Sequence, residues 1–187
     1  MAWLHMTCYM QWLHHLNQLK EVISDVLLLL VPRHPERFQS VIQLSLAHGF
    51  QTAQRSQFES INQHVDVLVV DSLGELMHFY SLSDYAFVGG SLVPIGGHNV
   101  LEPIALRVPV FCGPHISNFK AICQTLCDAQ AMVKMGTIHQ LIRALIEMHQ
   151  NEHQRRSQVD NASAVLTSNQ GAIGRYLEKI EGFLPNL

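Results

Sequence analysis

The stretch Asp84–Pro114, DYAFVGGSLVPIGGHNVLEPIALRVPVFCGP, decides the fold of this chain of 187 residues. Its first apolar run, Tyr85–Val88, is typical of a strand buried on both faces of a parallel sheet. Glycine pairs follow at 89–90 and 96–97, and a second apolar run, VPVFCG, indicates another buried strand. The stretch therefore predicts strand, glycine turn, helix and strand, which is the repeating unit of an α/β fold.

The middle of this stretch has the features of an anion and sugar site. Gly96 and Gly97 permit backbone angles that a Cβ would forbid, and a helix is expected to open at His98 and Asn99. The first N–H groups of a helix lack partners and attract anions. Glu102 would place a carboxylate one turn further on, suited to sugar hydroxyls beside a phosphate. The alternative is structural, because glycine pairs are common in α/β proteins and the helix dipole alone favours an early glutamate.

The remaining chain continues the alternation of strands and helices. Buried strands are predicted at VLLLLV (26–31), at 65–70 and at VPVFCG (108–113), with weaker strands near 50–53 and 131–133. Helical spacing is found at 36–48 before Gly49, after Asn118, and at 138–146, where Thr137 and Gln140 have capping-box spacing. Residues 55–63 are predicted to be a loop, and residues 151–187 to be helices with a break at 169–171.

Polar side chains follow the strand at 26–31. Ligands of open α/β sheets bind beyond the carboxyl ends of the strands, and Arg33, His34 and Arg37 cluster at such an end. A guanidinium can grip a phosphate or a carboxylate with two parallel hydrogen bonds, so Arg33 is the main candidate for an anion contact. The alternative is an ordinary surface pair of Arg33 with Glu36 around a helix start at Pro35.

Two further turns have a structural and a functional interpretation. Ser72 and Glu75 have capping-box spacing before a helix at Leu76, which explains them as structure alone. His115 and Asn118 follow the strand at 108–113, so they are expected either to line a ligand cleft or, for Asn118, to cap the next helix.

Composition excludes several classes of protein. The formal charge is −3 and no long basic block occurs, which argues against a nucleic-acid partner. Four irregularly spaced cysteines favour a reducing cytoplasm over a disulfide framework. The adjacent His14 and His15 would face different directions on a helix and no CxxC occurs, so no metal site is predicted.

The first 13 residues are apolar, but they lack the basic region and cleavage site of a signal peptide and are too short to span a bilayer. Two interpretations remain open for them. They form a helix packed on the sheet, which we favour, or a membrane-facing amphipathic patch made by the following side chains: Trp3, Leu4, Met6, Tyr9, Met10, Trp12 and Leu13.

Three motifs carry a family resemblance. GGSLVPIGGHNVLEP (89–103), PRHPERF (32–38) and DSLGEL (71–76) closely resemble the carboxyl-terminal half of the Kdo (3-deoxy-D-manno-octulosonic acid) transferases, over residues 20–180. The resemblance implies the donor half of an inverting, metal-independent GT-B glycosyltransferase that uses CMP-Kdo and no cofactor. We therefore expect one Rossmann-like domain with a parallel sheet at 21–187, after an atypical amino-terminal segment at 1–20.

The resemblance also implies the roles of site residues. Backbone around Leu73 and Gly74 would pack against the cytosine while Glu75 fixes the turn, His98 would donate to a phosphate oxygen, and Glu102 would accept from the ribose. The full set of expected substrate-binding residues is Arg33, His34, Ser72, Leu73, Gly74, Glu75, Gly89, Gly90, Ser91, Gly96, Gly97, His98, Asn99 and Glu102.

One departure from the family limits the expected function. The strand and Thr-His-Glu-Gly type turn that the family has before this half are missing, and the general base belongs to the amino-terminal domain, so no catalytic residue is assigned. The complete enzyme would transfer Kdo to a lipid A precursor in lipopolysaccharide biosynthesis, peripherally at the cytoplasmic face of the inner membrane. The alternatives are a non-catalytic nucleotide-binding remnant and a GT-B enzyme that uses a UDP-sugar, against which PRHPER argues.

Overall fold

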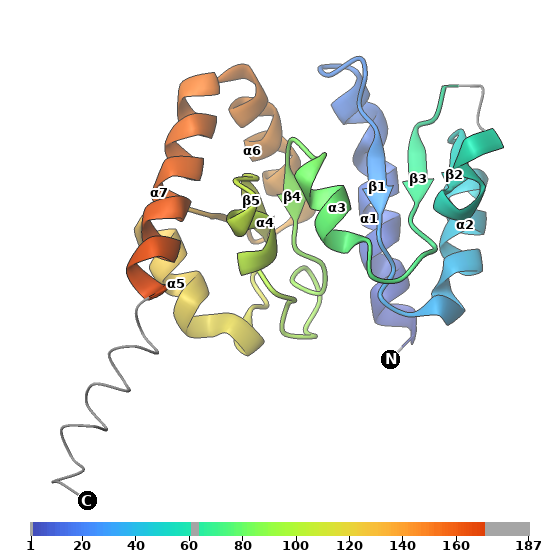
Figure 1. The fold of residues 1–187 in the computed structure, drawn as a ribbon. Helices are drawn as coiled ribbons and strands as arrows, with labels where there is room; N and C mark the ends of the chain where they lie inside the picture. Colours follow the sequence, from blue (N-terminus) through green and yellow to red (C-terminus); the bar gives the residue numbers. More distant parts are fainter. Residues whose placement is uncertain (1, 61–63, 171–187) are drawn as a thin grey trace, which may run out of the picture.

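Helices and strands alternate along the chain as the sequence predicts (Figure 1). The computed structural model describes residues 2–60 and 64–170. Its strands are β1 (Leu28–Leu30), β2 (Thr52–Gln54), β3 (Val67–Val69), β4 (Ala86–Phe87), β5 (Val110–Cys112) and β6 (Val133–Lys134). Its α-helices are α1 (Ala2–Lys20), α2 (Phe38–Ala47), α3 (Leu76–Ser81), α4 (Leu101–Ala105), α5 (Lys120–Asp128), α6 (Ile138–Gln150) and α7 (Glu152–Gln170). Three short 3-10 segments are η1 (Pro35–Arg37), η2 (Arg55–Ser60) and η3 (Ser117–Phe119).

All strand pairs are parallel, which confirms the predicted fold class. The strands form two three-stranded sheets, however, with the orders β1-β3-β2 and β4-β5-β6, rather than the single expected sheet. In the described chain β1 pairs with β3 alone and β4 with β5 alone. Because β4 contains only two residues, the ladder at this edge is short.

Helix α1 joins the two sheets. One apolar cluster contains Trp12 of α1, Phe111 of β5 and, at its border, Leu28 of β1, and the Trp12 ring lies 5.1 Å from the Phe87 ring of β4. A second cluster packs Leu13 and further α1 side chains against the first sheet. Figure 1 shows α1 behind β1. Helix α1, which directly precedes β1 but is distant in sequence from β4 and β5, therefore completes the core of both halves.

The packed-helix interpretation of the first residues is confirmed where the side chains are described. Trp12 is 7% exposed and Leu13 is 1% exposed, so neither belongs to a membrane-facing patch. The side chains of Trp3 and Leu4 lie outside the described residues. Among the described helices, none combines the length and the apolar character needed to cross a bilayer.

Polar contacts also hold α1. His14 approaches His48 at the end of α2 with 3.2 Å between ring nitrogens, and His15 approaches His139 of α6 at 3.0 Å. The two adjacent histidines thus face different directions, as expected for neighbours on a helix. Lys20 forms an ion pair with the buried Asp66, just before β3. These contacts fix α1 to both halves of the molecule.

Several local predictions are confirmed and others are wrong. Gly49 ends α2 with a φ of +83°, and the Thr137 hydroxyl accepts a hydrogen bond from the N–H of Gln140 at 3.3 Å. The stretch predicted as a loop from residue 55 instead begins with the 3-10 segment η2. Helix α7 runs as far as Gln170, inside the predicted break at 169–171; position 171 lies outside the described residues, so the break stays a prediction.

Candidate functional site

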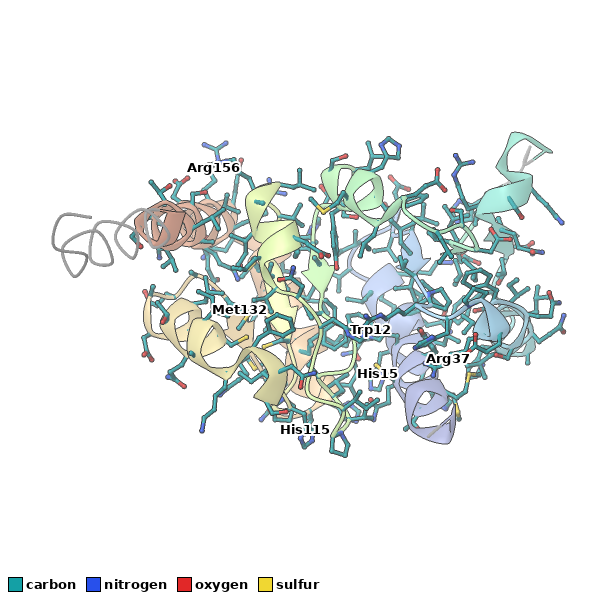
Figure 2. The ribbon with its side chains drawn as sticks, turned by 60° about the horizontal axis from the view of Figure 1, so that its bottom comes forward. Trp12, His15, Arg37, His115, Met132 and Arg156 are labelled. Atoms are coloured by element: carbon teal, nitrogen blue, oxygen red, sulfur yellow. The ribbon has the colours of Figure 1, made fainter. Side chains whose placement is uncertain are left out.

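The loops that follow β1, β3 and β4 lie together along the lower side of the molecule in Figure 1. Figure 2 turns this side forward, with Arg37 and His115 labelled on it. Parallel strands bring their carboxyl ends to one edge, which is where open α/β sheets bind ligands. The motifs PRHPER, DSLGEL and GGHN all follow such strand ends.

Two glycine pairs fold the loop between β4 and α4 onto itself. Gly90, Gly96 and Gly97 have φ angles of +72°, +99° and +73°, and the N–H of Gly97 donates to the carbonyl of Gly90 at 3.0 Å. The ring of His98 packs over the first pair, since a Cβ at Gly89 would lie 3.5 Å from the His98 ring and one at Gly90 3.4 Å. The glycines therefore hold His98 against the end of β4.

Asn118, in η3 between β5 and α5, stabilises this loop. Its side-chain Nδ2 donates to the carbonyl of Gly97 at 3.1 Å, and its backbone N–H donates to the carbonyl of Gly96 at 3.0 Å. Helix α5 begins only at Lys120 and receives no side-chain cap, so the prediction that Asn118 caps it is wrong. Gly96 has no room for a side chain, because a Cβ would lie 2.6 Å from Oδ1 of Asn118.

Ser91 belongs to the frame of the loop. Its side chain is fully buried, its hydroxyl donates to the carbonyl of Val88 at 2.6 Å, and the same oxygen accepts from the N–H of Gly113 at 2.8 Å. A Cβ on Gly113 would lie 2.2 Å from the carbonyl oxygen of Ser91, so only glycine permits this approach. The hydroxyl predicted to contact substrate is thus used inside the protein. In the next loop, the backbone N–H of His115 donates to the carbonyl of Ser91, and His115 itself is exposed.

Helix α4 begins at Leu101, later than the predicted opening at His98 and Asn99. The reason is that Asn99 turns its side chain back on the chain, accepting from the N–H of Leu101 at 3.0 Å and donating to Glu102 at 3.1 Å. Glu102 lies in the first turn, as predicted. Because peptide dipoles add along a helix, these five residues supply a small dipole, and side chains must carry the anion recognition.

Charged groups from separate motifs meet around His98. Burial lowers the pKa of His98, the positive charges of Arg33 and His34 lower it further, and the carboxylate of Glu102 opposes them. The imidazole is therefore neutral near pH 7 and offers one N–H donor. Two segments that are distant in sequence, 33–34 and 98–102, thus lie within electrostatic reach of each other.

Arg33 presents an exposed guanidinium at this edge. The surface pair of Arg33 with Glu36 that the sequence left open does not form, since Glu36 instead lies 3.9 Å from His34. Among the side chains that the structure describes, no carboxylate pairs with Arg33. Its charge is available to an anion from solution.

Tyr80 of α3 is a site residue that the sequence reasoning missed. Burial raises the pKa of its phenol to about 12, and the nearby negative charge of Glu102 contributes to the rise. The phenol is therefore a permanent O–H donor beside Glu102 at physiological pH. The apolar spacing of α3 gave no signal for this role, because the meeting of α3 with α4 is a tertiary contact.

The turn between β3 and α3 is built differently from the predicted capping box. Helix α3 begins at Leu76, and the hydroxyl of Ser72 donates to the carboxylate of Glu75 instead of accepting from a backbone N–H of the helix. Arg55 of η2 donates to the other oxygen of Glu75 at 3.0 Å. The hydrogen bond from Ser72 lowers the pKa of Glu75, and Arg55 lowers it further. Glu75 is thus an ionised anchor of the turn.

Comparisons with known proteins agree with these motifs. No family model matches the chain. A 3-deoxy-D-manno-octulosonic acid transferase of Haemophilus influenzae is 42% identical over 161 residues, which is 86% of this chain and 38% of the relative. One of Bordetella pertussis is 33% identical over 84% of this chain and 37% of the relative. The chain therefore spans less than two fifths of the length of these relatives.

A solved structure extends the similarity to the fold. The crystal structure of the C-terminal CMP-Kdo binding domain of WaaA from Acinetobacter baumannii superposes with a TM-score of 0.72 at 28% identity, covering 86% of this chain and 98% of that domain. In sequence and in fold, the chain corresponds to the carboxyl-terminal domain of the 3-deoxy-D-manno-octulosonic acid transferases.

Proposed function

We propose that this domain binds CMP-Kdo and forms the donor-binding half of a Kdo transferase. The observation that carries the proposal is the meeting of Arg33, from the loop after β1, with His98 and Glu102, from the loop and helix after β4, such that the charges of Arg33 and Glu102 both act on His98. A cation, a neutral N–H donor and a carboxylate at one sheet edge match the phosphate and the ribose of a nucleotide. The solved relative, described as a CMP-Kdo binding domain, supports the choice of nucleotide.

The proposed contacts follow from the chemistry of each group. Glu102 accepts hydrogen bonds from the ribose hydroxyls, and Arg33 binds the phosphate or the Kdo carboxylate, because a guanidinium grips either with two parallel bonds. His98 donates its N–H to a phosphate oxygen. Leu73 and Gly74 lie at the tip of the β3–α3 turn, where Leu73 is 69% exposed, and we assign this tip to the cytosine.

In the transfer reaction these groups would act on the leaving nucleotide. The acceptor hydroxyl attacks the anomeric carbon with inversion, and the bond to the CMP phosphate breaks. Donors that are already oriented toward the phosphate stabilise the charge that develops on it as CMP departs. The acceptor, a lipid A precursor, and the general base would come from an amino-terminal domain at the cytoplasmic face of the inner membrane. The relatives give no support to a UDP-sugar enzyme or to a non-catalytic remnant.

Calorimetry with CMP tests the proposal. Glu102→Ala removes a hydrogen bond to a charged group worth about 1.5 to 3 kcal/mol, so CMP affinity should fall roughly ten- to a hundredfold. Glu147→Ala, at an exposed position of α6, is the matched control and should leave affinity unchanged. A ribose-deoxy analogue of CMP should be insensitive to Glu102→Ala. No heat at millimolar CMP from a chain that circular dichroism shows to be folded would refute donor binding.

A further inference from the structure

The turn between β3 and α3 is held at both of its ends by two consecutive residues of η2. At its start, Asp71 accepts from the N–H of Ser56 at 2.8 Å and from the Ser56 hydroxyl at 2.5 Å. At its end, Glu75 accepts from the guanidinium of Arg55 at 3.0 Å. We call Arg55 and Ser56 the η2 clamp. It reaches the turn across 20 positions of sequence on one side and 15 on the other.

Between these anchors the turn projects an apolar tip. Leu73 is 69% exposed, the largest exposed fraction among the described large hydrophobic side chains, and Gly74 has a φ of +85°. An exposed leucine beside a glycine in this conformation offers a flat apolar surface together with open backbone. Such a surface suits the face of a nucleobase, provided that the turn does not have to be ordered when the ligand arrives.

We infer that Arg55 and Ser56 are positioning residues for the nucleobase, acting through Glu75 and Asp71 on the Leu73–Gly74 tip. The inference rests on the proposed CMP site and adds two residues to it. The carboxylates of Asp71 and Glu75 both accept hydrogen bonds from the η2 clamp, so their role is to hold the turn and not to bind the ligand. Its effect is to present the tip in one conformation before binding, which lowers the entropy cost of contact with the base.

This role predicts a loss of affinity that depends on the base. Freeing the backbone of one or two turn residues would weaken binding about tenfold, since the ligand must then order them. Arg55→Gln and Ser56→Ala should each weaken CMP by this factor and leave ribose 5-phosphate, which has no base, unchanged. Cytidine should weaken in parallel with CMP. Arg156→Gln is the matched control, because Arg156 also pairs with a carboxylate but lies on α7 away from the turn (Figure 2).

The test is calorimetry for CMP and ligand-observed NMR for cytidine and ribose 5-phosphate at millimolar concentration. Ser56→Ala changes no charge, so its loss of CMP affinity cannot come from a weaker field at the phosphate. Equal weakening of CMP and ribose 5-phosphate by Arg55→Gln, with rescue by Arg55→Lys, would reduce the role of Arg55 to its charge and overturn the inference. Unchanged CMP affinity in both variants would also overturn it. Failure of the unaltered chain to bind CMP would instead refute the proposed function, and the inference with it.

Discussion

Replacing Gly96 with alanine tests the geometry of the glycine loop most directly. Gly96 has a φ of +99°, and an added Cβ would lie 2.6 Å from Oδ1 and 2.7 Å from Cγ of Asn118. Two costs are therefore expected. The backbone conformation is strained for any L residue, and the side chain of Asn118 has to move away from its hydrogen bond to the carbonyl of Gly97.

The magnitude follows from these two terms. A non-glycine residue at positive φ costs about 1 to 2 kcal/mol. Displacing Asn118 breaks its bond to Gly97 and its longer one, of 3.4 Å, to the carbonyl of Ile95, at about 0.5 to 1.5 kcal/mol for a typical bond. Gly96→Ala should therefore reduce the free energy of unfolding by about 2 to 4 kcal/mol.

Gly49→Ala is the matched control, because Gly49 has a similar φ of +83° and no atom within 4 Å of the position of an added Cβ. Urea unfolding followed by circular dichroism should show a loss of only about 1 to 2 kcal/mol for this variant. The excess for Gly96→Ala measures the crowding against Asn118. In the double variant Gly96→Ala, Asn118→Ala the losses should be less than additive, since the two single changes break the same contacts.

Equal losses of unfolding free energy in the two glycine variants would refute this reasoning. If Gly96→Ala and Gly49→Ala destabilise the protein equally, and the double variant is additive, Asn118 does not brace the loop. The loop would then be held by its backbone alone.

Three further predictions concern the helix that joins the two sheets, a buried carboxylate and catalysis. Leu13→Ala should cost about 2.5 to 5 kcal/mol of unfolding free energy, because Leu13 is 1% exposed. Met10→Ala, on the exposed side of α1, should cost under about 0.5 kcal/mol. Equal losses in urea unfolding would mean that α1 is not part of the core. Burial alone would raise the pKa of Asp66, but the hydrogen bond from Lys20, the N–H of Gln51 and the charges of Lys20 and His64 lower it below its ordinary value. The stability that Asp66 contributes is therefore complete above the unfolded pKa of about 3.9 and is lost as the pH falls through that value toward the folded pKa. In the Asp66→Asn variant, the free energy of unfolding should therefore fall less steeply as the pH is lowered. An unchanged slope at acid pH would contradict the assignment. In a mass-spectrometric assay, the chain alone should give no Kdo-lipid product from CMP-Kdo and a lipid A precursor, because positioning of the acceptor supplies much of the rate. Robust product would show that this half holds its own general base.

The order and kind of the main elements could be predicted from local sequence. Apolar runs such as those that became β1 and β5 read as buried strands because a parallel sheet covered on both faces needs apolar side chains in both directions. Gly49 and Thr137 marked a helix end and a helix start correctly, since their local backbone and side-chain chemistry act within one turn. The motifs of the candidate site were likewise visible, because each is a short contiguous string.

Two helix-cap interpretations fail because a polar side chain near a helix start has more than one possible partner. A helix-start role was one of two interpretations for Asn118 and for Ser72. Asn118 instead bonds to the carbonyl of Gly97, and Ser72 to the carboxylate of Glu75. A hydroxyl or amide at such a position can serve the helix or a neighbour in space, and the choice depends on which neighbour the fold supplies. The residue that Asn118 serves, Gly97, is 21 positions away in sequence.

The sequence by itself determined the α/β class, the parallel pairing, the glycine loop and the family likeness, because all of these depend on residue type and on spacing within one element. Tertiary structure decided that α1 closes the core of both sheets, that Arg33, His98 and Glu102 share one electrostatic environment, and that Arg55 holds Glu75. The physical reason is that these contacts depend on the angles at which whole elements pack. Those angles are set by the sum of many buried contacts, which no short stretch of sequence contains.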